Sequence, residues 1–360
     1  MTAGELNAAA GGLKGAVPTV TVIMPVRNEE AFIARSLGAV LGQDYEPAAV
    51  DVLVVDGMSD DATRYIVRTM AEDAEVPIRL LDNPGRIAPT ALNVGLRHAR
   101  GEVIVRVDGH CEIAPDYVSA GVRHLLQDGV DGVGGPLDTI GDTPTARAIA
   151  VAMGHRFGVG GSAFRTAGAD APSRLVDTVA FPIYRRSAIE LAGGFDEELV
   201  RNQDDEYNYR LRKLGGQILL TGDVRAKYYS RSGFRSLWRQ YYQYGVWKVR
   251  VLQKHTRQMR PRQFVPLIFV LALLTTLAAA TVSPLGRLGF AAVTGTYLVT
   301  NLAVALRAHP SGFLRVALAF SILHLSYGTG FLVGLVRFAG RWGDRQGRAP
   351  SSVLPPPSST

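Results

Sequence analysis

The chain changes character after Arg262. Before this residue charged and apolar side chains are mixed, whereas three long runs without Asp, Glu, Lys or Arg follow it, at residues 264–282, 288–306 and 316–336. Each run is close to the roughly 20 residues that a helix needs to cross a bilayer. The sequence therefore predicts a membrane protein with a large folded front part and transmembrane helices within residues 263–338.

The ends of the chain fit this outline. Residues 1–17 are rich in Ala and Gly and lack a sustained apolar core, so we expect neither a signal peptide nor an anchor there. We expect residues 1–17 and 339–360 to be disordered and the front part to lie in the cytoplasm. The chain is then a multi-pass protein of the plasma membrane.

Positive charge bears on partners and on topology. The net charge is +7, and basic residues gather just before the first apolar run, which favours anionic lipid as a partner and disfavours nucleic acid. Three spans put the C-terminus outside, yet the tail carries arginines that favour the cytoplasmic side, namely Arg337, Arg341, Arg345 and Arg348. We expect three spans nonetheless, because each run has bilayer length and none can cross twice.

Strand and helix patterns alternate through the front part. Apolar runs at residues 20–26, 51–55, 78–81 and 103–107 are typical of buried strands, and apolar residues at helical spacing follow the first three. This alternation predicts an α/β fold with a mostly parallel sheet and right-handed crossovers. Asn28 is expected to cap the helix after the first strand. No Gly-x-Gly-x-x-Gly motif of dinucleotide-binding folds follows the first strand, and the P-loop motif Gly-x-x-x-x-Gly-Lys-Ser/Thr does not occur.

The fourth strand ends in Asp108-Gly109-His110. The carboxyl ends of parallel strands line the crevice where α/β sheets bind ligands, so both side chains are expected there. A carboxylate and an imidazole two residues apart can hold one Mg²⁺ or Mn²⁺ together with a diphosphate. The alternative is a tight turn, in which Asp-Gly is common. Cys111, next to His110, is the only cysteine, which excludes an intramolecular disulfide.

Six motifs in this order carry a resemblance to a known family. They are Val-Ile-Met-Pro-Val-Arg-Asn-Glu-Glu at 22–30, Val-Val-Asp-Gly-Met-Ser-Asp-Asp-Ala-Thr at 54–63, Asn-Val-Gly-Leu-Arg-His-Ala-Arg-Gly-Glu at 93–102, Val-Asp-Gly-His at 107–110, Gly-Gly-Phe-Asp-Glu at 193–197 and Asn-Gln-Asp-Asp-Glu-Tyr-Asn-Tyr-Arg at 202–210. Residues 18–250 thus resemble the family 2 glycosyltransferases with the GT-A fold, and among them the succinoglycan-type exopolysaccharide enzymes. We place the catalytic domain at residues 18–232.

The resemblance implies a hexosyl transfer with inversion from a nucleoside-diphosphate sugar, which we expect to be UDP-linked. Asp108 and His110 match the position of a divalent cation, Mg²⁺ or Mn²⁺, and of the donor diphosphate. The other donor-binding residues are assigned by the same resemblance and are Pro25, Arg27, Glu29, Asp56 and Arg86. For Asp56 a capping or turn role is the alternative.

Asp204 matches the catalytic base of the family, with Asp205 as the reserve. It lies at the start of an expected helix at 204–214, where the helix dipole favours a carboxylate that can accept a proton. The alternative is that the acids at positions 204–206 only stabilise the first turn.

Residues 233–262 are expected to form an amphipathic helix at the membrane interface, because Trp, Tyr and basic residues alternate along it. By resemblance it bounds the acceptor site through Gln240, Tyr244 and Trp247. The alternative is an ordinary amphipathic helix packed on the catalytic domain.

These observations favour a membrane-anchored glycosyltransferase that acts on a lipid-linked or polysaccharide acceptor in the synthesis of cell-surface polysaccharide. Two alternatives stay open. One is a polyisoprenyl-phosphate glycosyl synthase, and the other is a catalytically silent membrane subunit that binds nucleotide sugars.

Overall fold

The computed structural model describes residues 17–168, 170–230 and 233–355. The chain divides into two compact units. Unit 1 comprises residues 1–138, 167–228 and 348–360, and unit 2 comprises residues 139–166 and 229–347. Apart from Val17, the N-terminal stretch expected to be disordered lies outside the described residues.

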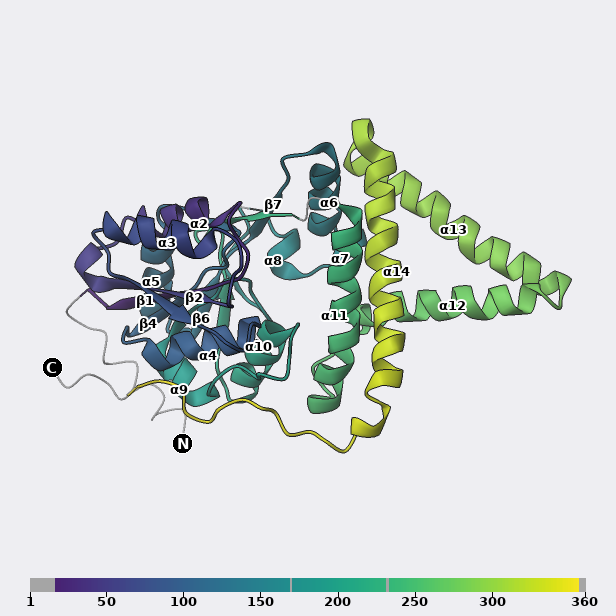
Figure 1. Ribbon diagram of the computed structural model, residues 1–360. Helices are drawn as coiled ribbons and strands as arrows, with labels where there is room; N and C mark the ends of the chain where they lie inside the picture. The colour runs from purple at the N-terminus through teal and green to yellow at the C-terminus, as the bar shows by residue number, and fades with distance from the viewer. Residues whose placement is uncertain (1–16, 169, 231–232, 356–360) are drawn as a thin grey trace. The chain divides into compact units, whose positions relative to one another are not determined.

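Unit 1 is built on an eight-stranded sheet with the order β3-β2-β1-β4-β9-β6-β10-β8 (Figure 1). The first four strands of this order are parallel, β9 is antiparallel to both neighbours, β6 and β10 are parallel, and β8 is antiparallel at the edge. The mostly parallel α/β sheet that the sequence predicts is thereby confirmed. The bounds are β1 (Val20–Val26), β2 (Val50–Asp56), β3 (Ile78–Asp82), β4 (Val103–Arg106), β6 (Gly132–Gly134), β8 (Arg174–Leu175), β9 (Ile183–Arg185) and β10 (Ile218–Leu220).

β1 lies between β2 and β4, and its register decides where the strand ends meet. Val20 pairs with Val50 of β2 and with Val103 of β4. Because these strands are parallel, their carboxyl ends share one edge, where Val26 stands beside Asp56. This is the edge at which α/β sheets bind ligands.

Helices cover the sheet of unit 1. In α2 the residues Ile33, Leu37 and Val40 are buried, in agreement with the helical spacing of the sequence. The helices of this unit are α2 (Ile33–Leu41), η2 (Pro47–Ala49), α3 (Thr63–Glu72), α4 (Ala88–His98), α5 (Tyr117–Gln127), α9 (Arg186–Ala192) and α10 (Gln203–Lys213).

A second, three-stranded sheet has the order β5-β11-β7. Its strands are β5 (Cys111–Ile113), β7 (Leu137–Ile140) and β11 (Ala226–Tyr229). β11 is antiparallel to β5, with Tyr228 opposite Cys111. The chain passes from one unit to the other within β7 and within β11.

Unit 2 is helical, and its last three long helices contain the apolar runs of the sequence. α12 and α13 form a V. Its apex is the turn at residues 281–283, and its open side faces α14 (Figure 1). α13 and α14 are long and apolar enough to cross a membrane, whereas α12 has 16 residues. The elements are α6 (Pro144–Gly154), α7 (Arg156–Val159), α8 (Ala163–Thr166), α11 (Phe234–Lys254), η3 (Pro261–Gln263), α12 (Val265–Ala280), α13 (Pro284–Ala308), η4 (Pro310–Gly312), α14 (Phe313–Arg337) and η5 (Ala339–Arg341).

α11 packs closely along α14. A methyl group at Gly330 of α14 would lie 2.1 Å from the carbonyl oxygen of Tyr242, and one at Gly334 would lie 2.7 Å from that of Val246. Such contacts are open only to glycine. α11 is therefore packed against α14 within unit 2, and its place at a membrane interface stays a prediction.

The C-terminal tail returns to unit 1. Gly194 donates its backbone N–H to the carbonyl of Pro350 at 2.8 Å, and Arg348 donates its own to the Asp196 carboxylate at 3.0 Å. Val353 is 5% exposed. These contacts of residues 348–353 differ from the disorder expected for residues 339–360, of which residues 356–360 lie outside the described residues. The pattern of apolar residues in the sequence does not predict these contacts. The tail packs against backbone that is accessible because Gly193 and Gly194 have no side chains.

Candidate active site

The loops after β1 and β2 are joined to each other at the carboxyl edge of the sheet. Asn28 donates from Nδ2 to the Asp60 carboxylate at 2.7 Å and accepts from the backbone N–H of Asp60 at 3.1 Å. Glu29 donates its N–H to the Thr63 hydroxyl at 2.8 Å. The expectation that Asn28 caps α2 is wrong, because its left-handed backbone (φ 54°) turns it toward the neighbouring loop and Phe32 is the N-cap residue.

His110 is held by Glu29. The Nδ1 atom of His110 lies 2.8 Å from Oε1 of Glu29, and Tyr228 packs edge-on against the imidazole at 5.1 Å between centroids. Gly109 permits this approach, since a Cβ there would lie 3.0 Å from the Glu29 side chain. A carboxylate on Nδ1 fixes the tautomer that leaves Nε2 free to bind a metal. Glu29, predicted to bind the donor, thus acts here on the imidazole.

Arg106 joins Asp108 to Asp204. Its guanidinium donates from Nε and Nη2 to the two carboxylate oxygens of Asp108, at 2.9 and 3.2 Å, and from Nη1 to Asp204. The Arg106 side chain is 7% exposed. Burial alone would lower its pKa, but the carboxylates of Asp108 and Asp204 outweigh burial and hold the pKa above the usual value, so the group stays charged.

This arginine was missed from the sequence. The available signal was its position, since a charged residue within a β-branched run that is expected to be buried on both faces needs a partner. The β-branched run that contains Arg106 does not show that Asp204 is a partner, because Asp204 is remote in sequence and reaches the site from α10.

Asp204 occupies the first turn of α10, as predicted, but its electrostatics differ from the prediction. Burial raises the pKa of the Asp204 carboxyl above its usual value, the Arg106 guanidinium opposes the rise, and Asp108 adds to it. The side chain is 35% exposed, so water moderates the shift. A raised pKa suits a general base, which works best when its pKa approaches the operating pH.

The acids that follow Asp204 have different surroundings. Glu206 is buried and pairs with Arg210 one turn later, at 2.9 Å, so it has the stabilising role of the alternative. Asp205 is half-buried and adds to the rise in the pKa of Asp204. Asp204 is thus the acid of this turn that contacts Arg106.

Asp56 is completely buried, with both of its carboxylate oxygens bonded inside unit 1. Ser59 donates its hydroxyl to Oδ1 at 2.5 Å and its N–H to Oδ2 at 3.0 Å, and Arg64 pairs with Oδ2 at 2.7 Å. These are the contacts of a structural turn, which was the alternative for this residue.

The remaining donor-site candidates lie on loops at the same edge. Pro25 is half-buried near the end of β1, opposite Val55. Arg27 is exposed, and its side chain lies across Gly57, 3.2 Å from where a Cβ would stand. Arg86 is exposed in a left-handed turn after β3 (φ 59°). Two exposed guanidinium groups at this edge are suited to an anionic ligand.

The three acceptor candidates are on α11 in unit 2. Gln240 is buried and donates to the Tyr244 hydroxyl at 3.1 Å. Trp247 packs on Phe338 at 5.6 Å between centroids, and the Arg337 guanidinium lies 5.8 Å from its ring centre. In this unit, Trp247 therefore serves the contact between α11 and the end of α14.

The residues present could hold a divalent cation if a substrate supplied the remaining ligands. Within the described part of the chain no group of three or more His, Cys, Asp or Glu side chains could hold a metal alone. Asp108 and His110 offer one oxygen donor and one nitrogen donor, a set compatible with Mn²⁺ or Mg²⁺ when diphosphate oxygens complete the shell.

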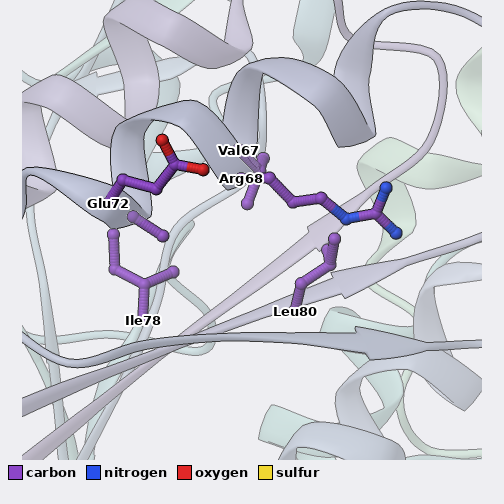
Figure 2. Close-up of a pocket in the computed structure, with 6 residues that line it drawn as sticks. Val67, Arg68, Glu72, Ile78 and Leu80 are labelled. Carbon is purple, nitrogen blue, oxygen red and sulfur yellow. The ribbon is translucent and has the colours of Figure 1, made fainter.

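A pocket of about 340 Å³ lies elsewhere on unit 1, between α3 and β3 (Figure 2). Its lining residues are Val67, Arg68, Ala71, Glu72, Ile78 and Leu80. They come from the end of α3 and the beginning of β3, opposite the carboxyl edge that carries the acids. None of them is a candidate site residue.

Known proteins resemble this chain along most of its length. The profile described as "Glycosyl transferase family 2" matches residues 21–191. The succinoglycan biosynthesis protein ExoA of Rhizobium meliloti (strain 1021) is 32% identical over 328 residues, which is 89% of this chain and 96% of that protein.

One more distant relative and one solved structure of similar fold extend the likeness. The dolichyl N-acetyl-alpha-D-glucosaminyl phosphate 3-beta-D-2,3-diacetamido-2,3-dideoxy-beta-D-glucuronosyltransferase of Methanococcus voltae is 25% identical over 242 residues, 65% of this chain and 74% of that protein. Among solved structures, the mannosyltransferase PcManGT from Pyrobaculum calidifontis, in complex with GDP-Man and Mn²⁺, has a TM-score of 0.55 at 23% identity and covers 89% of this chain and 97% of its own.

Proposed function

Since this chain belongs to glycosyl transferase family 2 and is a glycosyltransferase related to those of exopolysaccharide synthesis, we propose that it transfers a sugar with inversion from a nucleoside-diphosphate sugar to a lipid-linked or polysaccharide acceptor at the membrane. The observation that carries this proposal is the linkage of Asp108 and Asp204 through the buried Arg106. This linkage supports the assignment of Asp108 to the cation and of Asp204 to the base within one site.

The two acids have separate tasks in this proposal. Asp204 takes the proton from the attacking hydroxyl of the acceptor, for which its raised pKa is suited. Asp108 and Nε2 of His110 would hold Mn²⁺ or Mg²⁺, which neutralises charge on the departing diphosphate. Glu29 keeps the imidazole in the required orientation.

The donor would be bound at the carboxyl edge. Arg27 and Arg86 are exposed there and supply positive charge for a diphosphate. Pro25 and Asp56 would border the nucleotide, with Asp56 acting through the turn that it stabilises. We expect a UDP-linked donor. The Mn²⁺ and nucleotide sugar bound to PcManGT support a cation-assisted reaction of this type.

The names of two relatives and the side chains of α11 support the proposed acceptor. The Methanococcus voltae enzyme is named for a dolichyl-linked sugar phosphate, and ExoA for succinoglycan synthesis. Both names support a sugar carried on a lipid or a growing polysaccharide. Gln240, Tyr244 and Trp247 are proposed to border this acceptor, and unit 1 is proposed to lie on the cytoplasmic side of the plasma membrane.

The test is a panel of nucleotide sugars supplied to the purified full-length protein with a lipid extract and Mn²⁺, read by mass spectrometry of the lipid products. We expect one donor to be consumed and one lipid product to gain a sugar. Asp108→Asn and Asp204→Asn should abolish or strongly reduce this product. Asp223→Asn, which removes another ion-paired acid of unit 1, is the matched control.

The outcomes separate the alternatives. A product in which the sugar is attached directly to a polyisoprenyl phosphate would identify a polyisoprenyl-phosphate glycosyl synthase. Nucleotide-sugar binding without turnover of any donor, in the wild type as in the variants, would instead favour a silent binding subunit.

A further inference from the structure

We propose that α12 and α13 form a transmembrane hairpin that enters and leaves the bilayer on the side of unit 1, while α14 stays on that side. The inference deepens the membrane attachment in the proposed function and does not depend on its chemistry. It replaces the three spans expected from the sequence with two.

The first step is the position of charge along the hairpin. Residues 263–286 and 288–306 contain no Asp, Glu, Lys or Arg, so Arg287 stands alone between Arg262 and Arg307. Arg287 and Arg307 are about 30 Å apart along α13 at 1.5 Å per residue, which equals the thickness of the hydrocarbon core. In the middle of the bilayer the Arg287 charge would carry a large desolvation cost. It is accommodated if the apex reaches the far headgroup layer.

The second step is what surrounds the two helices. In its most apolar stretch only 11% of α13 is buried by the protein. Large side chains point outward along both helices, among them Ile268 (60% exposed), Leu274 (53%), Leu288 (66%) and Val299 (70%). An apolar surface of this extent is typical of contact with another apolar phase, and lipid is the occupant that matches its length.

Several polar side chains within the hairpin are bonded inside the protein, although the buried Thr294 hydroxyl of α13 has no partner among the described residues. The Thr275 and Thr276 hydroxyls donate to carbonyls one turn back, at 2.8 and 2.6 Å. Asn301 donates to the carbonyl of Ala317 at 3.0 Å and to the Ser321 hydroxyl at 2.8 Å. Such internal bonding is what hydrocarbon requires of polar groups.

The third step concerns α14. This helix is as apolar as a transmembrane helix, but other helices of unit 2 cover much of its surface. In its most apolar stretch 50% of the residues are buried, and α11 covers it from Tyr327 to Phe338. α11 carries the exposed Arg235 and Arg239 in the turns before Tyr242, and Tyr242 lies against Gly330 of α14. A spanning α14 would take these charges into the bilayer.

The tail gives independent support. Residues 348–353 belong to unit 1 and bond to Gly194 and Asp196. The end of the chain therefore lies on the same side of any membrane as unit 1, and the number of crossings must be even. Three spans would separate the tail from Asp196 by a bilayer.

The test is cysteine labelling by a membrane-impermeant maleimide in intact cells and after lysis. Cys111 can remain, because it is buried, and the wild type serves as the unlabelled control. Single cysteines replace Val282 at the apex (84% exposed), Ser311 between α13 and α14, and Gly340 after α14. Tyr65→Cys, at a site 72% exposed on α3, reports the side of unit 1.

We expect V282C to be labelled on the side opposite to Y65C, and both S311C and G340C on the side of Y65C. Labelling of V282C and G340C together opposite to Y65C would restore three spans and overturn the proposal. Labelling of S311C alone opposite to Y65C would overturn it in favour of crossings by α13 and α14. Release of the wild-type chain from membranes by alkaline carbonate without detergent would overturn insertion itself. Activity enters none of these readouts, so failure of the topology and failure of the proposed reaction are distinguishable.

Discussion

Replacement of Arg106 by methionine tests the electrostatic core of the site. The guanidinium makes two hydrogen bonds to Asp108 and one to Asp204. In Arg106→Met the volume is largely kept, but the two carboxylates lose their shared counter-charge. Each then faces the other as a like charge in a partly desolvated site.

The magnitude follows from burial. Removal of one partner from a buried ion pair costs about 3–5 kcal/mol. The side chains of Asp108 and Asp204 are 20% and 35% exposed, so water screens part of this loss. We expect the free energy of unfolding of unit 1 to fall by about 2–3 kcal/mol, which corresponds to roughly 4–12 °C in Tm for a domain of this size.

The assay uses two reporters that the chain already contains. Cys111 is the only cysteine and is buried in unit 1, so its reaction with a fluorogenic maleimide against temperature follows the opening of unit 1. The three tryptophans, Trp238, Trp247 and Trp342, are all in unit 2. Their fluorescence is the internal control, and its midpoint should change much less than that of Cys111 labelling.

A double-mutant cycle with Asp204→Asn decides whether the effect comes from this contact. We expect Arg106→Met to cost less in the Asp204→Asn background, with a coupling energy of at least about 1 kcal/mol, because residues in one ion-pair network are not additive. Additivity within about 0.5 kcal/mol would refute the electrostatic account and leave only a packing role for Arg106.

Three further predictions concern the reaction. Asp204→Asn should lower kcat by about 10² to 10⁴ and leave nucleotide-sugar binding, measured by calorimetry, nearly unchanged; loss of binding would contradict its role as base. Because the pKa of Asp204 is raised and the base must be ionised, activity should fall as the pH drops through a value above the ordinary aspartate pKa. Arg106→Met removes a positive charge that lowers this pKa, so it should move the acid limb of the pH–rate profile to higher pH. An acid limb that stays in place would exclude Asp204 as its source. Glu29→Ala should weaken Mn²⁺ binding about 10- to 100-fold in a spectroscopic titration, whereas Glu30→Ala should not, because Glu29 and not Glu30 holds His110.

The sequence predicts the parallel half of unit 1 well, and the reason is local. Residues 20–26 and 50–56 are apolar runs that need burial on both faces, and the following helices show regular apolar spacing. Parallel strands then bring their carboxyl ends to one edge without further information. Asp108 and His110 share the site because they are adjacent in the chain.

The parts that the sequence does not predict depend on remote contacts. One partner of Arg106, Asp204, comes from α10, and the raised pKa of Asp204 reflects its burial in the folded site. Asn28 illustrates the same limit at short range. Asn is a common helix-capping residue. Here, however, Asn28 makes two hydrogen bonds with Asp60 of the loop after β2 and does not cap α2.

The topology conflict in the sequence has a physical origin that hydropathy cannot detect. Hydropathy scores a residue by its own transfer energy and ignores what covers it. A helix half covered by protein therefore scores like one surrounded by lipid. α14 is such a helix, because α11 lies along it and Arg250 pairs with Asp344 just beyond its end. If α14 is removed from the count, the four tail arginines and the docked residues 348–353 agree on one side of the membrane. Under the two-span topology proposed above, the positive charges of the tail are better evidence for topology than the length of the last apolar run.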